Sequence, residues 1–328
     1  MCLCILSGLS VTSEHLKVLI TGASGFIGSR VINRIMATRD WRLFAVQHRS
    51  RTKLPNSVKV FSDCDLTDGD SLEGKLSGID VIVHLAGRAH VLKESSSDPL
   101  SEFRRVNVHA SGILARQAVT AHAKRFIFVS SIGVNGNQTS DRPFSYRDEP
   151  EPMDDYAQSK LEAEYELSDA LRDSSTALTI VRPPLVYGPS APGNFGHLVR
   201  LVAMGVPLPL GLIENARSFV YLDNLVDLLM RCIEDKSAVN EVFLVSDGQD
   251  VSTPEFVRQL AAAMNKKCWL IPIPLAVLRV SARLFGRLPD LRRLTGSLQI
   301  DIRHTCETLD WRPPFSMTEG IMRTVAKQ

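Results

Sequence analysis

The sequence has no cysteine or histidine pair at the spacing of a metal site. Its six cysteines are scattered over 328 residues, and none forms a C-x-x-C pair. Thiols distributed in this way are typical of a reduced compartment rather than of a disulfide scaffold. We therefore expect free thiols and no metal ion.

Targeting and membrane-spanning segments are also missing from the pattern. Met1–Val11 is mildly apolar but lacks a basic leader and a full apolar core, and no other segment reaches transmembrane length. We expect a cytoplasmic protein, with residues 1–15 forming an extension ahead of the fold.

The sequence has no large excess of either charge, since 38 lysines and arginines nearly balance 36 acidic residues. The formal net charge is only +2, which gives no reason to expect a nucleic-acid or membrane partner. The composition, 44% hydrophobic and 23% charged, is that of an ordinary globular protein with ample material for a large core.

The first half of the chain alternates short apolar runs with amphipathic helical stretches. The expected strands are Leu16–Thr21, Arg42–Gln47, Val58–Ser62, Asp80–His84, Arg125–Ser130 and Ala177–Arg182. The expected helices between them are Phe26–Ala37, Ser71–Leu76, Leu100–Ala123 and Asp155–Arg172. This alternation predicts βαβ units, hence an α/β fold with a doubly wound parallel sheet of the Rossmann type.

After Arg182 the pattern changes, because prolines interrupt the chain and strand candidates become sparse. We expect residues 16–183 to form the nucleotide-binding domain and residues 184–328 to form mainly a smaller, mixed substrate lobe, with some strands returning to the main sheet. Ligands in such folds bind beyond the carboxyl ends of the strands.

A glycine-rich turn follows the first expected strand and opens a helix. Gly22 permits a tight turn, Gly25 lets the backbone approach a pyrophosphate, and Gly28 allows close packing of the helix on the strand. With Phe26 and Ile27, these residues form the start of a helix whose amide groups can bind phosphate. The turn predicts a dinucleotide cofactor.

The end of the second strand bears on the choice of cofactor. NAD sites usually carry an acidic residue there for the ribose 2′-hydroxyl, but no acidic residue occurs between Trp41 and Ser62. His48, Arg49, Arg51 and Lys53 stand there instead. Cations suit the 2′-phosphate of NADP(H), which we therefore favour; NAD(H) and a simple solvated basic loop stay open as alternatives.

Tyr156 and Lys160 lie one helical turn apart and should share a face. An ammonium group beside a phenol should lower the pKa of the phenol, so that Tyr156 can exchange a proton with a sugar oxygen. Upstream, a buried strand ends at Ser130-Ser131, where the Ser131 hydroxyl could bond the same oxygen. These three residues, Tyr156, Lys160 and Ser131, are the candidate catalytic group.

Together these motifs resemble the extended short-chain dehydrogenase/reductases, which include nucleotide-sugar 4-epimerases, 4,6-dehydratases and 4-keto reductases. The resemblance runs from about Lys17 to the C-terminal region. Beyond the motifs above, it rests on Asp65-Leu66, His84-Leu85-Ala86-Gly87, Asn107 and the segment from Arg182 to Pro189.

The resemblance implies further site residues. For the cofactor it implies Asp65 and Leu66 beside the adenine, Leu85, Ala86 and Gly87 along the phosphates and ribose, Lys160 on the nicotinamide ribose, and also Asn107, Ser130, Arg182 and Pro183. For a nucleotide-linked sugar it implies Arg88, Ser131, Gly133, Asn135, Tyr156, Asn194 and Arg217. A surface salt bridge is an equal alternative for Arg217.

The resemblance leaves two reactions open. A 4,6-dehydratase needs an extra acid and base after the catalytic hydroxyl residue, where this chain has Ile132 and Gly133, so that reaction is set aside. The basic end of the second strand favours a reductase of a UDP-linked 4-keto-6-deoxy-N-acetylhexosamine. The segment Gly296–Asp301 also resembles bacterial O-antigen enzymes. A UDP-hexose (glucose or N-acetylglucosamine) 4-epimerase is the alternative.

A non-catalytic NADP-sensing scaffold is the alternative from another class. Such proteins typically lose the tyrosine or the lysine, and this chain has both. By the habit of the family we expect a homodimer formed through the helices near Leu100–Ala123 and Asp155–Arg172.

Overall fold

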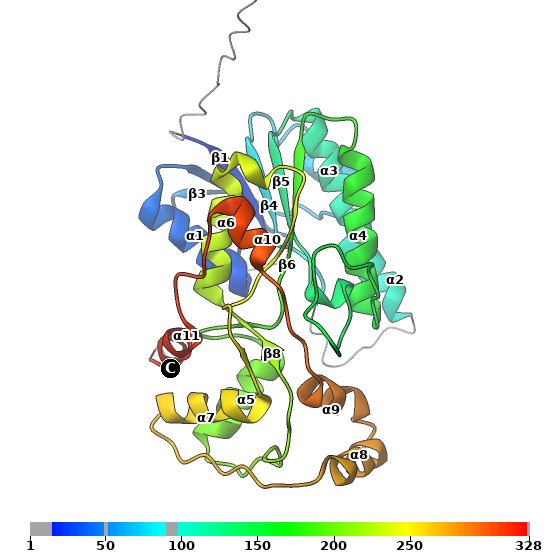
Figure 1. Cartoon of the computed structure of the whole chain (residues 1–328). Helices are drawn as coiled ribbons and strands as arrows, with labels where there is room; N and C mark the ends of the chain where they lie inside the picture. The colour runs from blue at the N-terminus through cyan, green and yellow to red at the C-terminus, as the bar shows by residue number, and fades with distance from the viewer. Residues whose placement is uncertain (1–14, 49–51, 90–97, 327–328) are drawn as a thin grey trace, which may run out of the picture.

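Seven parallel strands form one sheet in the part of the chain that the computed structural model describes, residues 15–48, 52–89 and 98–326. Their order across the sheet is β10, β6, β5, β4, β1, β2, β3 (Figure 1). The strands are β1 (Lys17–Thr21), β2 (Arg42–Val46), β3 (Val58–Phe61), β4 (Val81–His84), β5 (Arg125–Val129), β6 (Ala177–Arg182) and β10 (Val242–Leu244). The doubly wound parallel sheet expected from the sequence is thus confirmed.

Helices cover both faces of this sheet. Successive residues of β1 point to opposite faces, so Val18 and Ile20 pack with α1 (Phe26–Thr38) and α6 (Leu222–Glu234). Leu19 packs on the other face, with the core beneath α3 (Ala110–Thr120) and α4 (Asp155–Leu171). All three β1 side chains are fully buried, which explains why the strands read as continuous apolar runs.

The strand order reverses at β1. From β1 the chain proceeds through β2 to β3, and then crosses back to β4 on the opposite side of β1. The loops that follow β1 and β4 therefore diverge and leave a crevice at the carboxyl edge of the sheet. The glycine turn and the segment Leu85–Arg88 lie at this edge.

Two expected helices differ in the structure. The helix expected at Ser71–Leu76 is a 3₁₀ turn at Gly69–Leu72, because Gly74, at φ +68°, takes a left-handed conformation. The long helix expected at Leu100–Ala123 consists of α2 (Pro99–Phe103), a π-helical segment at Arg104–His109, and α3. The π-helical segment contains Asn107.

The second half of the chain builds a smaller lobe below the sheet in Figure 1. Its core is formed by α5 (Gly193–Ala203), α7 (Thr253–Ala263) and α11 (Met317–Val325). Its remaining elements are β7 (Val186–Tyr187), β8 (Arg217–Ser218), β9 (Val220–Tyr221), β11 (Asp250–Val251), α8 (Leu275–Leu284) and α9 (Leu288–Thr295). The chain also returns to the upper body, where β10 pairs with β6 and α10 (Arg303–Leu309) packs on β10.

Candidate active site

The glycine turn between β1 and α1 has the geometry of a phosphate cradle. A Cβ added at Gly22, whose φ is +67°, would lie 2.8 Å from the Ala86 nitrogen, so the turn packs directly against the loop after β4. A Cβ at Gly28 would lie 2.2 Å from the Gly22 oxygen, so only glycine lets α1 approach so closely. Gly25 precedes α1, and no side chain caps the helix. Its first amide groups are therefore open to an anionic ligand.

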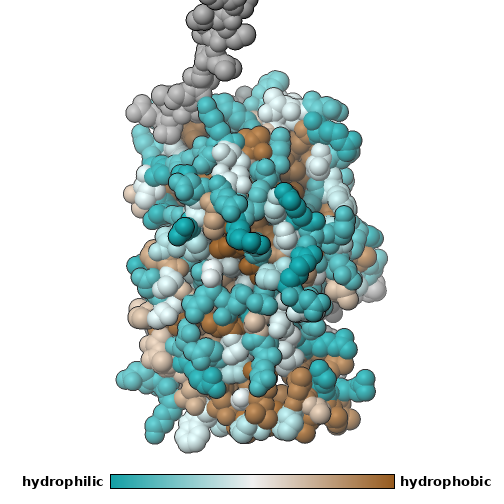
Figure 2. Space-filling view, in the orientation of Figure 1, coloured by the Kyte–Doolittle hydropathy of each residue, from teal (hydrophilic) through white to brown (hydrophobic). Residues whose placement is uncertain are grey.

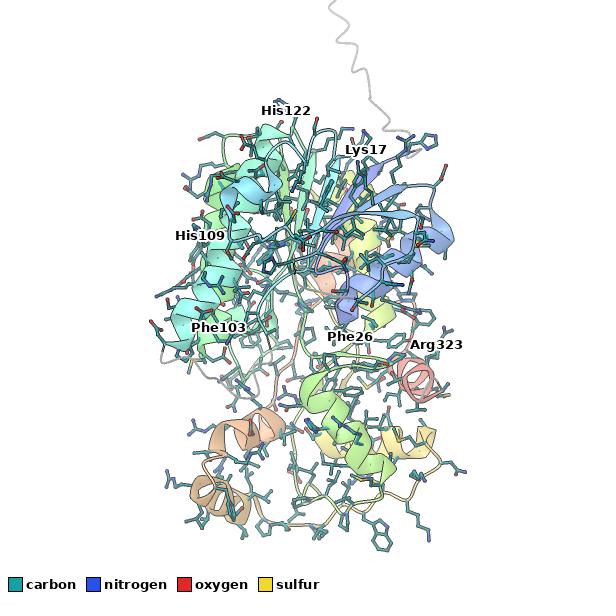
Figure 3. All side chains as sticks on the ribbon, turned by 180° about the vertical axis from the view of Figure 1, so that it is seen from behind. Lys17, Phe26, Phe103, His109, His122 and Arg323 are labelled. Carbon is teal, nitrogen blue, oxygen red and sulfur yellow. The ribbon has the colours of Figure 1, made fainter. Side chains whose placement is uncertain are left out.

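A cavity of about 470 Å³ lies beside this turn. It is lined by Ser24, Gly25, Phe26, Ser29, Arg30, Asn33, Pro189, Ser190, Pro192 and Leu222. The cavity therefore lies between the glycine turn and the segment that enters the smaller lobe. In Figure 3, Phe26 lies at the lower border of the sheet domain, facing that lobe. The residues present fit the diphosphate of a dinucleotide.

A chain of hydrogen bonds fixes the loop after β4. The Thr21 hydroxyl oxygen accepts the amides of Leu85 (3.2 Å) and Ala86 (3.1 Å), so its own proton is donated to His84 Nδ1 at 2.7 Å. His84 Nε2 then donates to the Ser111 hydroxyl (2.8 Å), which donates to the Asn107 carbonyl (2.6 Å). Burial lowers the pKa of His84 to about 3, so the ring stays neutral. The chain links the glycine turn to the π-helical segment.

Asn107 clamps the same loop from the other side. Its side-chain oxygen accepts the Arg88 amide at 2.7 Å, and its amide group donates to the Arg88 carbonyl and to the Ser159 hydroxyl of α4. π-helical turns are common at functional sites because they redirect a side chain. Here the turn points Asn107 at the loop that carries Gly87, where an added Cβ would meet the Asn107 oxygen at 3.1 Å.

Tyr156 and Lys160 occupy the first turns of α4, next to the end of β5. Asp154 caps this helix by accepting the Ala157 amide at 2.8 Å. Lys160 is buried; its ammonium group donates to the Val129 carbonyl at 3.0 Å and lies 4.5 Å from the centroid of the Phe128 ring. The half-buried Tyr156 ring packs edge-on against Phe103, which Figure 3 labels at the lower edge of the sheet domain.

The pKa of Tyr156 differs from the expectation. Burial, aided by the Asp154 carboxylate, raises the pKa of Tyr156 to about 12. The Lys160 ammonium group is directed at the Val129 carbonyl, and burial lowers the pKa of Lys160 itself to about 8. The expected activation to a phenolate is therefore wrong for this arrangement. At neutral pH Tyr156 is a phenol with a proton to donate.

Two serine hydroxyls lie at the end of β5. Ser130 is buried, and its hydroxyl has no hydrogen-bond partner among the described residues. A buried orphan hydroxyl fits a polar group of a bound ligand. Ser131 caps a 3₁₀ turn at Ile132–Val134, where its oxygen accepts the Gly133 amide at 3.1 Å. Since the oxygen serves as acceptor in that bond, the Ser131 proton can be donated elsewhere.

The side chains of Arg182 and Asn135 are hydrogen-bonded to each other. The Arg182 guanidinium donates to both oxygens of Glu164 on α4, at 3.0 and 2.5 Å, and to the Asn135 side-chain oxygen at 3.0 Å. The Asn135 amide group donates to the Ser145 carbonyl. All three side chains are buried. The polar groups of Arg182 and Asn135 thus hold the site's loops, and direct ligand contact by either side chain stays a prediction.

The ends of β2 and β3 bring His48 and Asp65 together. His48 Nε2 lies 3.6 Å from Asp65 Oδ2, and both side chains are partly exposed. Asp65 accepts the Thr67 amide and hydroxyl, and these bonds lower the pKa of its carboxyl group. Lys53 is exposed, whereas Arg49 and Arg51 lie outside the described residues. Leu66 packs against the core on the α3 side.

The smaller lobe contributes Asn194 and Arg217. Asn194 is exposed in the first turn of α5. Arg217 is half-buried and donates to the Gly296 carbonyl at 2.7 Å, and no carboxylate pairs with it among the described residues. Desolvation lowers its pKa to about 10. A desolvated guanidinium without a carboxylate favours an anionic ligand, which argues against the surface salt bridge.

Some positioning residues were missed from the sequence. Glu164 lies four residues after Lys160, so helical spacing places the two residues on the same face of α4. The sequence alone does not show that Glu164 pairs with Arg182, because the two residues belong to different elements. Thr21, His84 and Ser111 form the hydrogen-bond chain. The sequence predicted the elements that contain them but not the bonds between them.

No cluster of metal-binding side chains occurs among the described residues. None of the helices in the described ranges is long and apolar enough to span a membrane.

Known proteins are similar to this chain in sequence and in fold. The profile of the NAD dependent epimerase/dehydratase family matches residues 18–246. A UDP-glucose 4-epimerase of Vibrio cholerae is 43% identical over 310 residues, which cover 94% of this chain and 94% of that protein. The structure of a UDP-glucose 4-epimerase of Thermotoga maritima with UDP-glucose aligns with a TM-score of 0.77 at 22% identity, covering 95% of this chain and 98% of that one. A UDP-glucuronic acid 4-epimerase of Bacillus cereus in complex with NAD also aligns at 0.77, with 19% identity and coverage of 95% and 98%.

Proposed function

Since the chain belongs to the NAD dependent epimerase/dehydratase family, we propose that it is a nucleotide-sugar enzyme that reduces the C4 keto group of a UDP-linked 4-keto-6-deoxy-N-acetylhexosamine. The observation that carries this proposal is the placement of Tyr156 and Lys160 in the first turns of α4, which packs against the 3₁₀ turn that Ser131 caps. Reduction of a ketone requires a proton donor at the oxygen, and a phenol with a pKa of about 12 is such a donor at neutral pH.

The roles of the site residues follow from their chemistry. When bound, a reduced nicotinamide nucleotide supplies the hydride for the keto carbon. Tyr156 donates its proton to O4, and the Ser131 hydroxyl donates a hydrogen bond that orients the same oxygen. Lys160, whose ammonium group is held by the Val129 carbonyl, would hold the nicotinamide ribose of the bound cofactor.

The preference for NADP(H) is supported by the residues after β2. His48 and Lys53 are exposed there, and no carboxylate occurs among the described residues between Trp41 and Phe61. Lys53 would offer a positive charge to the 2′-phosphate of NADP(H), while the Asp65 carboxylate that follows β3 lies beside His48. An exchangeable reduced cofactor suits a reductase, which consumes one equivalent in each turnover.

The UDP group is supported by Arg217 and Asn194 in the smaller lobe. Arg217 offers a half-buried guanidinium without a carboxylate partner in the described residues, and Asn194 is exposed at the start of α5. A guanidinium fork suits two adjacent phosphates. The 4,6-dehydratase reaction is not proposed, because Ser131 is followed by the buried, apolar Ile132 and by Gly133.

A UDP-hexose 4-epimerase is the second candidate, favoured by the name of the Vibrio cholerae relative. An epimerase uses the same tyrosine in both directions but retains its cofactor, because the hydride returns to the sugar. A non-catalytic NADP-sensing scaffold is less well supported, since Tyr156 and Lys160 are both present. We further propose a homodimer formed through the α2–α4 side of the sheet, an O-antigen pathway and a cytoplasmic location.

The experiment that separates these candidates is identification of the nucleotide in the purified protein. Mass spectrometry of the released nucleotide is followed by fluorescence titration with NADPH and NADH. Protein that is purified without nucleotide and binds NADPH more tightly supports the reductase. Tightly retained NAD with weak NADPH binding supports the epimerase instead.

A further inference from the structure

The outer face of α8 is apolar and exposed. Leu278 is the buried residue of this helix, while Val277, Val280 and Leu284, spaced at i, i+3 and i+7, point away from it with exposed fractions of 56%, 62% and 79%. Phe285, the next residue, is also 79% exposed. An isolated exposed leucine needs no explanation, but an apolar stripe along a whole helix does.

The stripe continues into the segment that leads to α8. Trp269 and Ile271 there are 60% and 44% exposed. This segment is fixed to the lobe, because the Ile271 amide donates to the Leu208 carbonyl and Leu208 donates to Trp269. In Figure 1 the segment runs along the lower end of the lobe into α8, and Figure 2 shows hydrophobic residues gathered at that lower edge. We call these six residues, 269, 271, 277, 280, 284 and 285, the apolar rim.

The segment of the chain that carries the apolar rim is rich in positive charge. Residues 264–300 contain seven lysines and arginines and one acidic residue, so their formal net charge of +6 exceeds the +2 of the whole chain. Arg279 and Arg283 lie on the flank of α8 between its buried and exposed apolar faces, and both are exposed. No carboxylate pairs with either of them in the described ranges. The rest of the chain is therefore net acidic.

We propose that the apolar rim and its arginines bind the surface of an anionic lipid bilayer. An apolar helix face flanked by basic residues is the pattern of a helix that lies in the membrane interface. Arg279 and Arg283 can keep their guanidinium groups at the lipid phosphates while Leu284 and Phe285 enter the acyl boundary. The low net charge of the chain argued against a membrane partner only because acidic residues elsewhere offset this segment.

A second copy of the chain is the competing occupant of this face. Charge disfavours it, since two copies meeting there would each bring a segment of net charge +6. An anionic bilayer offers the opposite sign.

Vesicle flotation of the full chain tests the proposal. The protein is mixed with vesicles of phosphatidylcholine alone, or of phosphatidylcholine with phosphatidylglycerol, at low and high salt. We expect binding to the anionic vesicles only, weakened by salt. The double variant R279Q/R283Q should weaken it about 30-fold and L284S/F285S about 100-fold.

Matched controls carry the same changes at exposed positions on other elements. M36S/M322S replaces two exposed methionines of α1 and α11, and R34Q/R172Q removes an exposed arginine of α1 and the exposed arginine that follows α4. Both controls should bind anionic vesicles as the natural protein does. Equal loss in the controls, or no binding to anionic vesicles by the natural protein, would overturn the proposal. Dissociation of an oligomer by L284S/F285S in light scattering, with vesicle binding unchanged, would overturn it in favour of a subunit interface.

Discussion

Replacing Glu164 with glutamine should destabilise the protein far more than the same change one or two residues away on the helix surface. Glu164 and Arg182 have side chains that are only 5% and 7% exposed, and the carboxylate accepts two bonds from the guanidinium. In Glu164→Gln the buried Arg182 cation loses its carboxylate partner and keeps only neutral side-chain amide oxygens, those of the new glutamine and of Asn135. Removing one partner of a buried ion pair typically costs about 3 to 5 kcal/mol.

The size of the thermal shift follows from the length of the chain. At roughly 2.1 cal/mol/K for each residue, the entropy of unfolding of 328 residues is about 0.7 kcal/mol/K. A loss of about 3 to 5 kcal/mol therefore lowers Tm by about 4 to 7 °C. Thermal unfolding followed by circular dichroism measures this shift.

The control is Glu166→Gln on the same helix. Glu166 pairs with Arg116, but these side chains are 36% and 55% exposed, so water and salt screen the pair. We expect a loss below about 1 kcal/mol, or a shift of about 1 °C. Equal shifts in the two variants would refute the reasoning. The double replacement Glu164→Leu/Arg182→Met should recover much of the stability, because no charge is left buried.

Three further variants test the site. Tyr156→Phe should lower kcat about 10²- to 10⁴-fold while the Kd for the nucleotide stays within about twofold, and the exposed Tyr165→Phe should change neither; full activity in Tyr156→Phe would refute the role of the phenol. Folding lowers the pKa of Lys160 from 10.5 to about 8, so the charged lysine opposes folding below about pH 8 and this cost fades as the pH rises toward 10.5. In urea unfolding, the natural protein should therefore gain about 2 to 3 kcal/mol relative to Lys160→Met between pH 7 and 10.5; a constant difference would contradict the shift. Asn107→Ala removes the bonds to Arg88 and Ser159 and should weaken nucleotide binding about tenfold in a fluorescence titration, whereas the exposed Asn137→Ala should not.

The sheet was readable from the sequence because its signal is local. Six of its seven strands were predicted, because they are short, mainly apolar runs next to turn or helix patterns. The strand β10 was not named, since it is only three residues long and pairs with β6 from far along the chain. The glycine turn was readable in part for the same reason, since Gly25 and Gly28 approach the Gly22 carbonyl within the turn, whereas the approach of Gly22 to Leu85 and Ala86 is not local. A local pattern predicts what the backbone does nearby.

The polar network beneath the site was not readable, because its partners are distant in sequence. Arg182 and Glu164 are 18 residues apart and lie on different elements, and Asn135 reaches Arg182 from a third. The π-helical segment at Arg104–His109 has no sequence pattern that distinguishes it from an α-helix, so it is seen only in the backbone of the structure, where Asn107 bonds Arg88. The pKa of Tyr156 depends on burial, which the spacing of Tyr156 and Lys160 does not reveal.

We propose that this protein reduces the C4 keto group of a UDP-sugar, and the transfer of deuterium from the nicotinamide to the sugar is the direct test of this reaction. The purified protein is incubated with UDP-4-keto-6-deoxy-N-acetylglucosamine and NADPH deuterated at C4 of the nicotinamide, and the product is examined by NMR and mass spectrometry. The account predicts one equivalent of NADPH consumed for each product formed, with deuterium at C4 of the sugar. Interconversion of UDP-glucose or UDP-N-acetylglucosamine with its C4 epimer, without consumption of NADPH and without deuterium in the product, would contradict it.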